Sequence, residues 1–155
     1  MARSLSQNYI EEEDIELIES VNYQVEKSDD FYRLGQSIES LVIPENSMNE
    51  NYFRKLIISG LKNLREIQIN NNTFMYVRTC TIDNLPKLNR LMIGEKCFMT
   101  NECESEVFYT PVHSQFTLTN CESLTSLTIG DFSFENYTFC KMESENSFSF
   151  FTRSS

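Results

Sequence analysis

One pattern of eleven positions recurs four times along this chain of 155 residues. It reads aliphatic-x-x-aliphatic-x-Ile-x-x-x-small-Phe/Met and begins at Ile38, Leu64, Leu88 and Leu124, in steps of 26, 24 and 36 residues. Its aliphatic-x-Ile segment is typical of a half-buried strand, because alternate side chains point to opposite faces. Such a strand cannot bury its inner face alone, whereas stacked coils of similar length share one core. The pattern predicts a solenoid of parallel β-strands stacked in about four coils.

A second pattern precedes the first from its second copy onward. It reads apolar-x-apolar-x-x-apolar, begins at Leu56, Cys80 and Phe116, and ends three residues before the next repeat each time. Because both patterns agree in register, we expect a returning strand in each coil. The first strands and the Phe or Met of each repeat should then form the core: Leu41, Ile43, Ile67, Ile69, Leu91, Ile93, Leu127 and Ile129, closed by Met48, Phe74, Phe98 and Phe134.

The chain divides into an N-terminal part and a repeat part. We expect an acidic N-terminal helical cap at 1–35 and the repeat solenoid at 36–155. The longest step between repeats predicts an insertion loop at about 101–114, which is polar and contains Pro111.

The N-terminal helix is expected over about 9–27. Asn8-x-x-Glu11 resembles a capping box. Apolar residues then recur at helical spacing and favour an amphipathic helix that covers the first coil: Ile10, Leu17, Ile18, Val21 and Val25. A free helix that offers this apolar stripe to a partner is the alternative.

The repeats resemble leucine-rich repeats of the divergent BspA-like type, over about residues 36–140. The segments 85–94 and 121–130 carry the resemblance best, with Leu/Cys-x-x-Leu-x-x-Leu-x-Ile-Gly. The resemblance implies a leucine-rich-repeat-like solenoid that binds proteins or other ligands on its strand-lined face, without catalysis by the repeats. The common repeat has an Asn or Cys ladder just after the strand. Here Pro44, Asn70, Gly94 and Gly130 stand at that turn, so no regular ladder is expected.

The formal net charge is −10 and lies at one end. Residues 1–50 contribute −9, and residues 51–155 contribute −1. A nucleic-acid partner would require a basic surface, and an anionic membrane surface would repel this chain. The acidic stretch is interpreted as a solvated helix face, with a docking tail for a basic partner as the alternative.

The sequence predicts neither a membrane-spanning helix nor a secretory signal at the N-terminus. No apolar run approaches the ~18–20 residues of a membrane helix, and the N-terminus has no apolar segment typical of a secretory signal. A cytoplasmic protein is therefore expected. The alternative is a fragment of a longer chain, exported or not.

The residues that carry chemistry are few. The five cysteines include no Cys-x-x-Cys pair, which argues against a disulfide framework and a zinc site. No Gly-rich phosphate loop is present, so no cofactor or metal is expected. His113 is the only histidine and could pair with Cys97 or Cys103 for nucleophilic catalysis. No oxyanion-hole signature accompanies such a pair, and we expect the chain not to be an enzyme.

The expected function is noncatalytic protein–protein interaction through the strand-lined face. The candidate binding residues point outward from the first strands of successive coils, and an ordinary solvated sheet face is the alternative interpretation. These residues are Glu66, Gln68, Arg90, Met92, Ser126 and Thr128, with Ser40 and Val42 beside them. Phe108, Tyr109 and Pro111 in the insertion form the other candidate surface, and the alternative is that they pack against the coil.

The C-terminal end suggests a second function. Phe148 and Phe150 alternate like one more strand of the return row. That strand is an exposed edge, or the chain continues in a longer protein, or a partner covers it. The alternative function is therefore a structural or adhesive segment of a larger repeat protein, with end-to-end self-association through the C-terminal coil.

Overall fold

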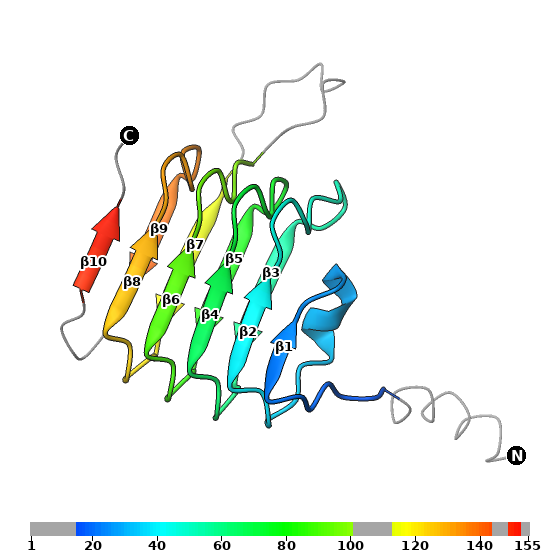
Figure 1. The fold of residues 1–155 in the computed structure, drawn as a ribbon. Coiled ribbons are helices and arrows are strands. Elements are labelled where there is room, and N and C mark those ends of the chain that lie inside the picture. Colours follow the sequence, from blue (N-terminus) through cyan, green and yellow to red (C-terminus); the bar gives the residue numbers. More distant parts are fainter. Residues whose placement is uncertain (1–14, 101–112, 144–148, 153–155) are drawn as a thin grey trace, which may run out of the picture.

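The computed structural model describes residues 15–100, 113–143 and the backbone of 149–152. The chain alternates between two parallel β-sheets that face each other (Figure 1). The six-stranded sheet contains, in spatial order, β1 (Asn22–Gln24), β2 (Ser40–Ile43), β4 (Glu66–Ile69), β6 (Arg90–Ile93), β8 (Ser126–Ile129) and β10 (Ser149–Thr152). The four-stranded sheet contains β3 (Lys55–Ser59), β5 (Thr79–Asp83), β7 (Gln115–Thr119) and β9 (Phe139–Met142). A short 3₁₀ helix, η1 (Ser28–Tyr32), contacts β3.

The arrangement is a stack of two-strand coils, compatible with a repeat solenoid. A coil is one strand of the six-stranded sheet together with the strand of the other sheet that follows it in the chain. The described residues contain four such coils, β2 with β3, β4 with β5, β6 with β7 and β8 with β9. Each strand pairs in parallel with its counterpart one coil away, so the predicted stacking of parallel strands is confirmed.

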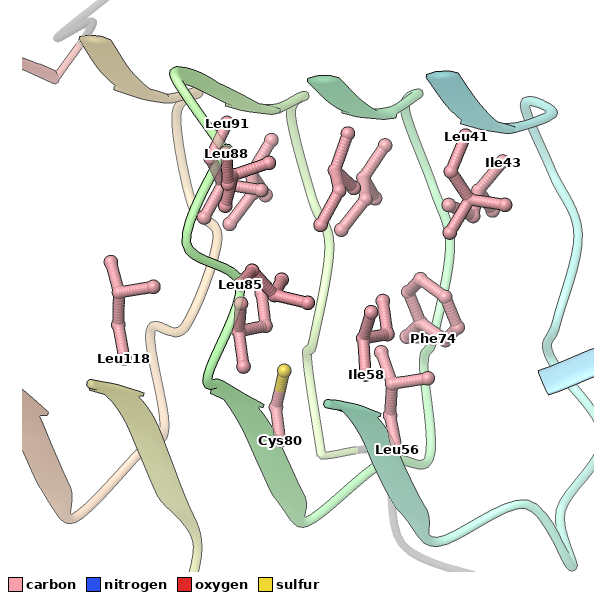
Figure 2. Packing of buried hydrophobic residues seen from close by; sticks show 14 of the residues in the cluster. Leu41, Ile43, Leu56, Ile58, Phe74, Cys80, Leu85, Leu88, Leu91 and Leu118 are labelled. Atoms are coloured by element: carbon pink, nitrogen blue, oxygen red, sulfur yellow. The ribbon is translucent and has the colours of Figure 1, made fainter. Parts of the chain in front are cut away.

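The predicted core column is confirmed by register and burial. Ile43, Ile69, Ile93 and Ile129 are successive partners across β2, β4, β6 and β8. They and the leucine or isoleucine two positions earlier are at most 7% exposed. Figure 2 shows Leu41 and Ile43 pointing across the interior toward the residues of the opposite sheet. Burial of each such side chain stabilises the fold by about 1.5–3 kcal/mol.

The predicted return row is confirmed as well. Leu56, Cys80 and Phe116 are partners across β3, β5 and β7, and each is at most 1% exposed. Their partners two positions on are Ile58, Ile82 and Leu118, which are equally buried. Side chains two positions apart on a strand point to the same face, so each return strand contributes two residues to the core.

A column of aromatic rings closes the coils from the side. Phe74 and Phe98 stack with their ring centroids 4.9 Å apart, and Phe98 and Phe134 stack at 4.6 Å. All three residues have a positive φ, between 56° and 60°. This left-handed backbone costs roughly 1–2 kcal/mol per residue without a glycine. Complete burial of Phe74 and Phe98 offsets that cost.

A hydrogen-bonded ladder runs through the turn, at a different position from the one just after the strand, where no regular ladder was expected. It uses the small residue four positions after the strand-ending isoleucine rather than the residue just after the strand. Thr73 Oγ1 donates to Cys97 Sγ at 3.3 Å, and Cys97 N donates to Ser133 Oγ at 2.9 Å. Ser133 Oγ in turn donates to the carbonyl of Gly94 at 2.6 Å. Adjacent coils are therefore joined by side chains as well as by strand pairing.

The predicted N-terminal helix is wrong over the residues that the structure describes. From Ile15 to Lys27 the chain contains no helix; it contains a bridge between Ile18 and Leu34 and the strand β1, which pairs with β2. The helical spacing is misleading because this segment is paired in a parallel sheet, and Leu17 and Val21 stay about half exposed. Residues 1–14 lie outside the described residues, as does the acidic run at 11–14.

The last strand also differs from expectation. β10 pairs with β8 in the six-stranded sheet, with Phe150 beside Leu127, and does not join the return row. The return row ends instead with β9, which pairs with β7. Most of the predicted insertion, residues 101–112, lies outside the described residues, including Cys103, Phe108 and Tyr109. Within the described ranges, no helix has the length and apolar character needed to cross a membrane.

Candidate binding surface

The structure brings all six candidate residues together on one outward sheet face. Glu66, Arg90 and Ser126 are partners across β4, β6 and β8 and form one row. The second row follows two positions later and consists of Gln68, Met92 and Thr128. In-register neighbours of a parallel sheet project to the same side, and the residues between these rows point into the core. Glu66, Gln68 and Arg90 are exposed, whereas Met92, Ser126 and Thr128 are partly covered.

The second row lines a hollow at the carboxyl ends of the strands. Its volume is about 370 Å³, and the turns after β4, β6 and β8 form the rest of its wall. The lining residues from these turns are Asn70, Asn71, Gly94, Glu95 and Gly130.

Two glycines make this edge of the sheet possible by letting neighbouring turns approach closely. A Cβ at Gly130 would lie 2.5 Å from the carbonyl carbon of Gly94. A Cβ at Gly94 would lie 2.9 Å from the backbone nitrogen of Asn71. Neither glycine has a positive φ; the left-handed turn residues are Asn46, Asn72, Lys96 and Phe132 instead. The glycines therefore serve coil spacing, although the sequence suggests a turn role.

Side-chain amides contribute polar groups to the hollow. Gln68 Nε2 donates to Asn70 Oδ1 at 2.9 Å, which joins the amide of the second row to the amide of the turn after β4. Asn71 Oδ1 accepts the backbone N–H of Glu95 at 2.8 Å and joins two turns. The side chain of Met92 adds an apolar, adaptable wall. Such a lining suits a side chain with an apolar stem and a hydrogen-bonding tip.

The arrangement around His113 offers no activated nucleophile among the described residues. His113 is exposed and shares a shallow hollow of about 410 Å³ with Thr79, Ser114, Gln115, Thr138 and Phe139. Burial raises the pKa of the Cys97 thiol, which opposes formation of a thiolate.

No group of three His, Cys, Asp or Glu side chains in the described ranges is placed to hold a metal ion.

Two further hollows lie at opposite ends of the four-stranded sheet. One has a volume of about 450 Å³ and lies beside β3, lined by Phe31, Phe53 and Ile57 among others. The other, of about 330 Å³, lies beside β9. Both are mainly apolar, so the described residues cover the core less completely at its two ends than in its middle.

No protein-family model matches the chain, and no curated protein or solved structure matches it. The resemblance to leucine-rich repeats therefore rests on the repeated residues alone.

The sequence indicates the two rows of the sheet face but not the hollow. Asn70, Asn71, Glu95 and Gly94 follow strands at fixed repeat positions, and this recurrence was the signal for a shared edge. The hollow itself depends on how closely three turns approach one another, which is a property of the stacked coils.

Proposed function

We propose that this chain is a noncatalytic protein-interaction module, built as a leucine-rich-repeat-like solenoid, which binds another protein through the outward face of its six-stranded sheet. The observation that carries this proposal is the alignment of Gln68, Met92 and Thr128 along one hollow of about 370 Å³. Three separate coils contribute one side chain each, and a surface shared in this way extends with the stack. A cytoplasmic location and the absence of a cofactor remain predictions from the sequence.

The composition of the face favours a protein partner. Arg90 and Met92 lie at its centre on β6, and arginine and methionine are enriched at protein interfaces. Glu66 and Gln68 flank them on β4. No ion pair joins Arg90 to Glu66 in the described ranges, so both charges are available to groups on a partner.

The test is an affinity purification with a matched control on the opposite sheet. Arg90→Glu with Met92→Glu changes the proposed face. The control is Lys55→Glu with Ile57→Glu on the outward face of β3, where both residues are exposed. Like the first pair, it replaces one basic and one apolar residue, two positions apart, with glutamate. We expect the protein captured by the wild type to be lost with the first pair and retained with the second. Undiminished capture by the first pair would exclude this face.

A further inference from the structure

The two sheets end unequally at the C-terminal end of the stack. β10 extends the six-stranded sheet by one strand past β8, whereas the four-stranded sheet ends at β9. Among the described residues, no strand of the return row therefore lies opposite β10. At the other end, the return position next to β3 is occupied by η1, which contacts that strand (Figure 1).

The described residues leave the core partly uncovered at this vacant position. Cys140 and Met142 of β9 are the partners of Phe116 and Leu118 of β7, so they face the same interior. Phe116 and Leu118 are 1% and 2% exposed, whereas Cys140 is exposed and Met142 is half-buried. The apolar hollow of about 330 Å³ beside β9 is also lined by Ile129 and Phe134 of the last complete coil. A strand added beside β9 would cover these groups and pair the backbone edge of β9 that no described strand occupies.

The N-terminal segment of the same chain has the chemistry of the missing strand. Ile15 and Leu17 are 51% and 52% exposed, and residues 15–17 belong to no helix or strand. They repeat the apolar-x-apolar pattern of every return strand. Figure 1 shows this segment running out from the foot of β1, at the end of the stack opposite β10. It therefore lies far from the vacancy of its own molecule.

We propose that residues 15–17 of one copy occupy the vacant return position beside β9 of a second copy. In a parallel arrangement, Ile15 lies beside Cys140 and Leu17 beside Met142, with their side chains in the apolar hollow. The residue between them, Glu16, then lies beside Lys141, whose side chain is 48% exposed and pairs only weakly with the exposed Glu143. The charges of the two segments are thus complementary.

This contact joins different surfaces of the two copies. Each chain carries one donor segment and one vacancy, at opposite ends, so the association is heterologous and continues into a chain or closes into a ring. The outward face of β4, β6 and β8 stays uncovered. The inference therefore stands apart from the proposed protein-binding function, and either can fail alone.

The test is sedimentation velocity of the full chain over a micromolar to millimolar range. The wild type should associate further as its concentration rises. Leu17→Glu removes the donor and Met142→Glu removes the vacancy. Each should weaken association at least about tenfold, because a buried unpaired carboxylate is costly. An equimolar mixture of the two variants should form a complex of two chains and no more, because each supplies the part that the other lacks.

Controls make the outcome specific. Ile57→Glu introduces the same charge beside the apolar hollow at β3. Ile57 is 46% exposed, similar to the 52% of Leu17, and its replacement should leave association unchanged. Glu16→Lys and Lys141→Glu should each weaken association, and mixing them should restore it. Circular dichroism checks that every variant folds. If Met142→Glu does not fold, Lys141→Glu takes its place as the variant that alters β9. A wild type that stays monomeric throughout, or association lost with Ile57→Glu and kept with Leu17→Glu, would overturn the proposal.

Discussion

The hydroxyl of Tyr23 donates a 2.7 Å hydrogen bond to the buried carboxylate of Asp30 and joins β1 to η1. The same carboxylate oxygen accepts the backbone N–H groups of Glu26 and Lys27, and the other oxygen pairs with Arg33 at 2.9 Å. Burial and this contact raise the pKa of Tyr23 to about 12. Asp30 thus fixes the first turn of the stack, where the predicted helical cap is not found.

Replacement of Asp30 should destabilise this end strongly. Asp30→Asn removes the charge that four donors address, and hydrogen bonds to charged groups are worth about 1.5–3 kcal/mol. We expect a loss of about 2 kcal/mol in the free energy of unfolding measured with urea. Asp29→Asn changes an exposed neighbour on η1 and should cost under about 0.5 kcal/mol. Equal losses for the two variants would show that the Asp30 contacts contribute little.

The ionisation of Asp30 should also make the stability of the fold depend on pH. Burial opposes its ionisation, but hydrogen bonds from Tyr23, the backbone and Arg33 outweigh burial and lower its pKa. The ionised group therefore stabilises the fold fully above its unfolded pKa, about 3.9, and this contribution is lost as the pH falls through the lower folded pKa. Between about pH 5 and pH 2, the free energy of unfolding measured with urea should fall less for Asp30→Asn than for the wild type. An equal fall in the free energy of unfolding for both proteins would contradict this stabilising role of ionised Asp30.

Gly130 should tolerate no side chain, because its neighbour is the backbone of Gly94. Gly130→Ala forces the turns apart and should cost about 1–3 kcal/mol, as overpacking does. Gly60 is the matched control: its φ is +73°, and an added Cβ would meet nothing within 4 Å. Gly60→Asn should be nearly neutral, since Asn84 and Asn120 adopt the same left-handed backbone at the equivalent positions. Thermal melts compare the two, and a neutral Gly130→Ala would contradict the close spacing of the coils.

Ser133 should matter through its hydroxyl rather than its size. Ser133→Ala leaves the carbonyl of Gly94 and the N–H of Cys97 without their partner, at a cost of about 1–3 kcal/mol. Ser123 also donates a 2.6 Å hydrogen bond, to Pro86, but it is exposed and water can replace it. Ser123→Ala should therefore stay within about 0.5 kcal/mol of the wild type in urea unfolding. Equal losses of unfolding free energy for Ser133→Ala and Ser123→Ala would show that the ladder does not stabilise the fold.

The repeated core was predictable because burial imposes a local period. Leu91 and Ile93 are buried for the same reason as Leu127 and Ile129, and each copy of the pattern indicates it independently. The first strand was not predictable in this way. Ile18 and Val21 fit a helical face, but pairing of β1 with β2 overrides that local pattern.

The candidate surface was predictable only in part. Alternation along each strand places Arg90 and Met92 outward once the strands are known. The hollow beside Met92 requires Gly94 and Gly130 to lie back to back, although 36 positions separate them in the chain. The sequence signal is a glycine after a strand, which fits a turn equally well.

The stacking of coils can be measured directly by nuclear Overhauser effects between isoleucine methyl groups in selectively labelled protein. The paired register predicts cross-peaks from Ile69 to Ile43 and to Ile93, and from Ile93 to Ile129. Ile93→Leu assigns the central signal with little change in volume. A continuous path of cross-peaks through these four residues supports the stack of parallel coils. The absence of contact between Ile69 and Ile93 in the folded protein would contradict it.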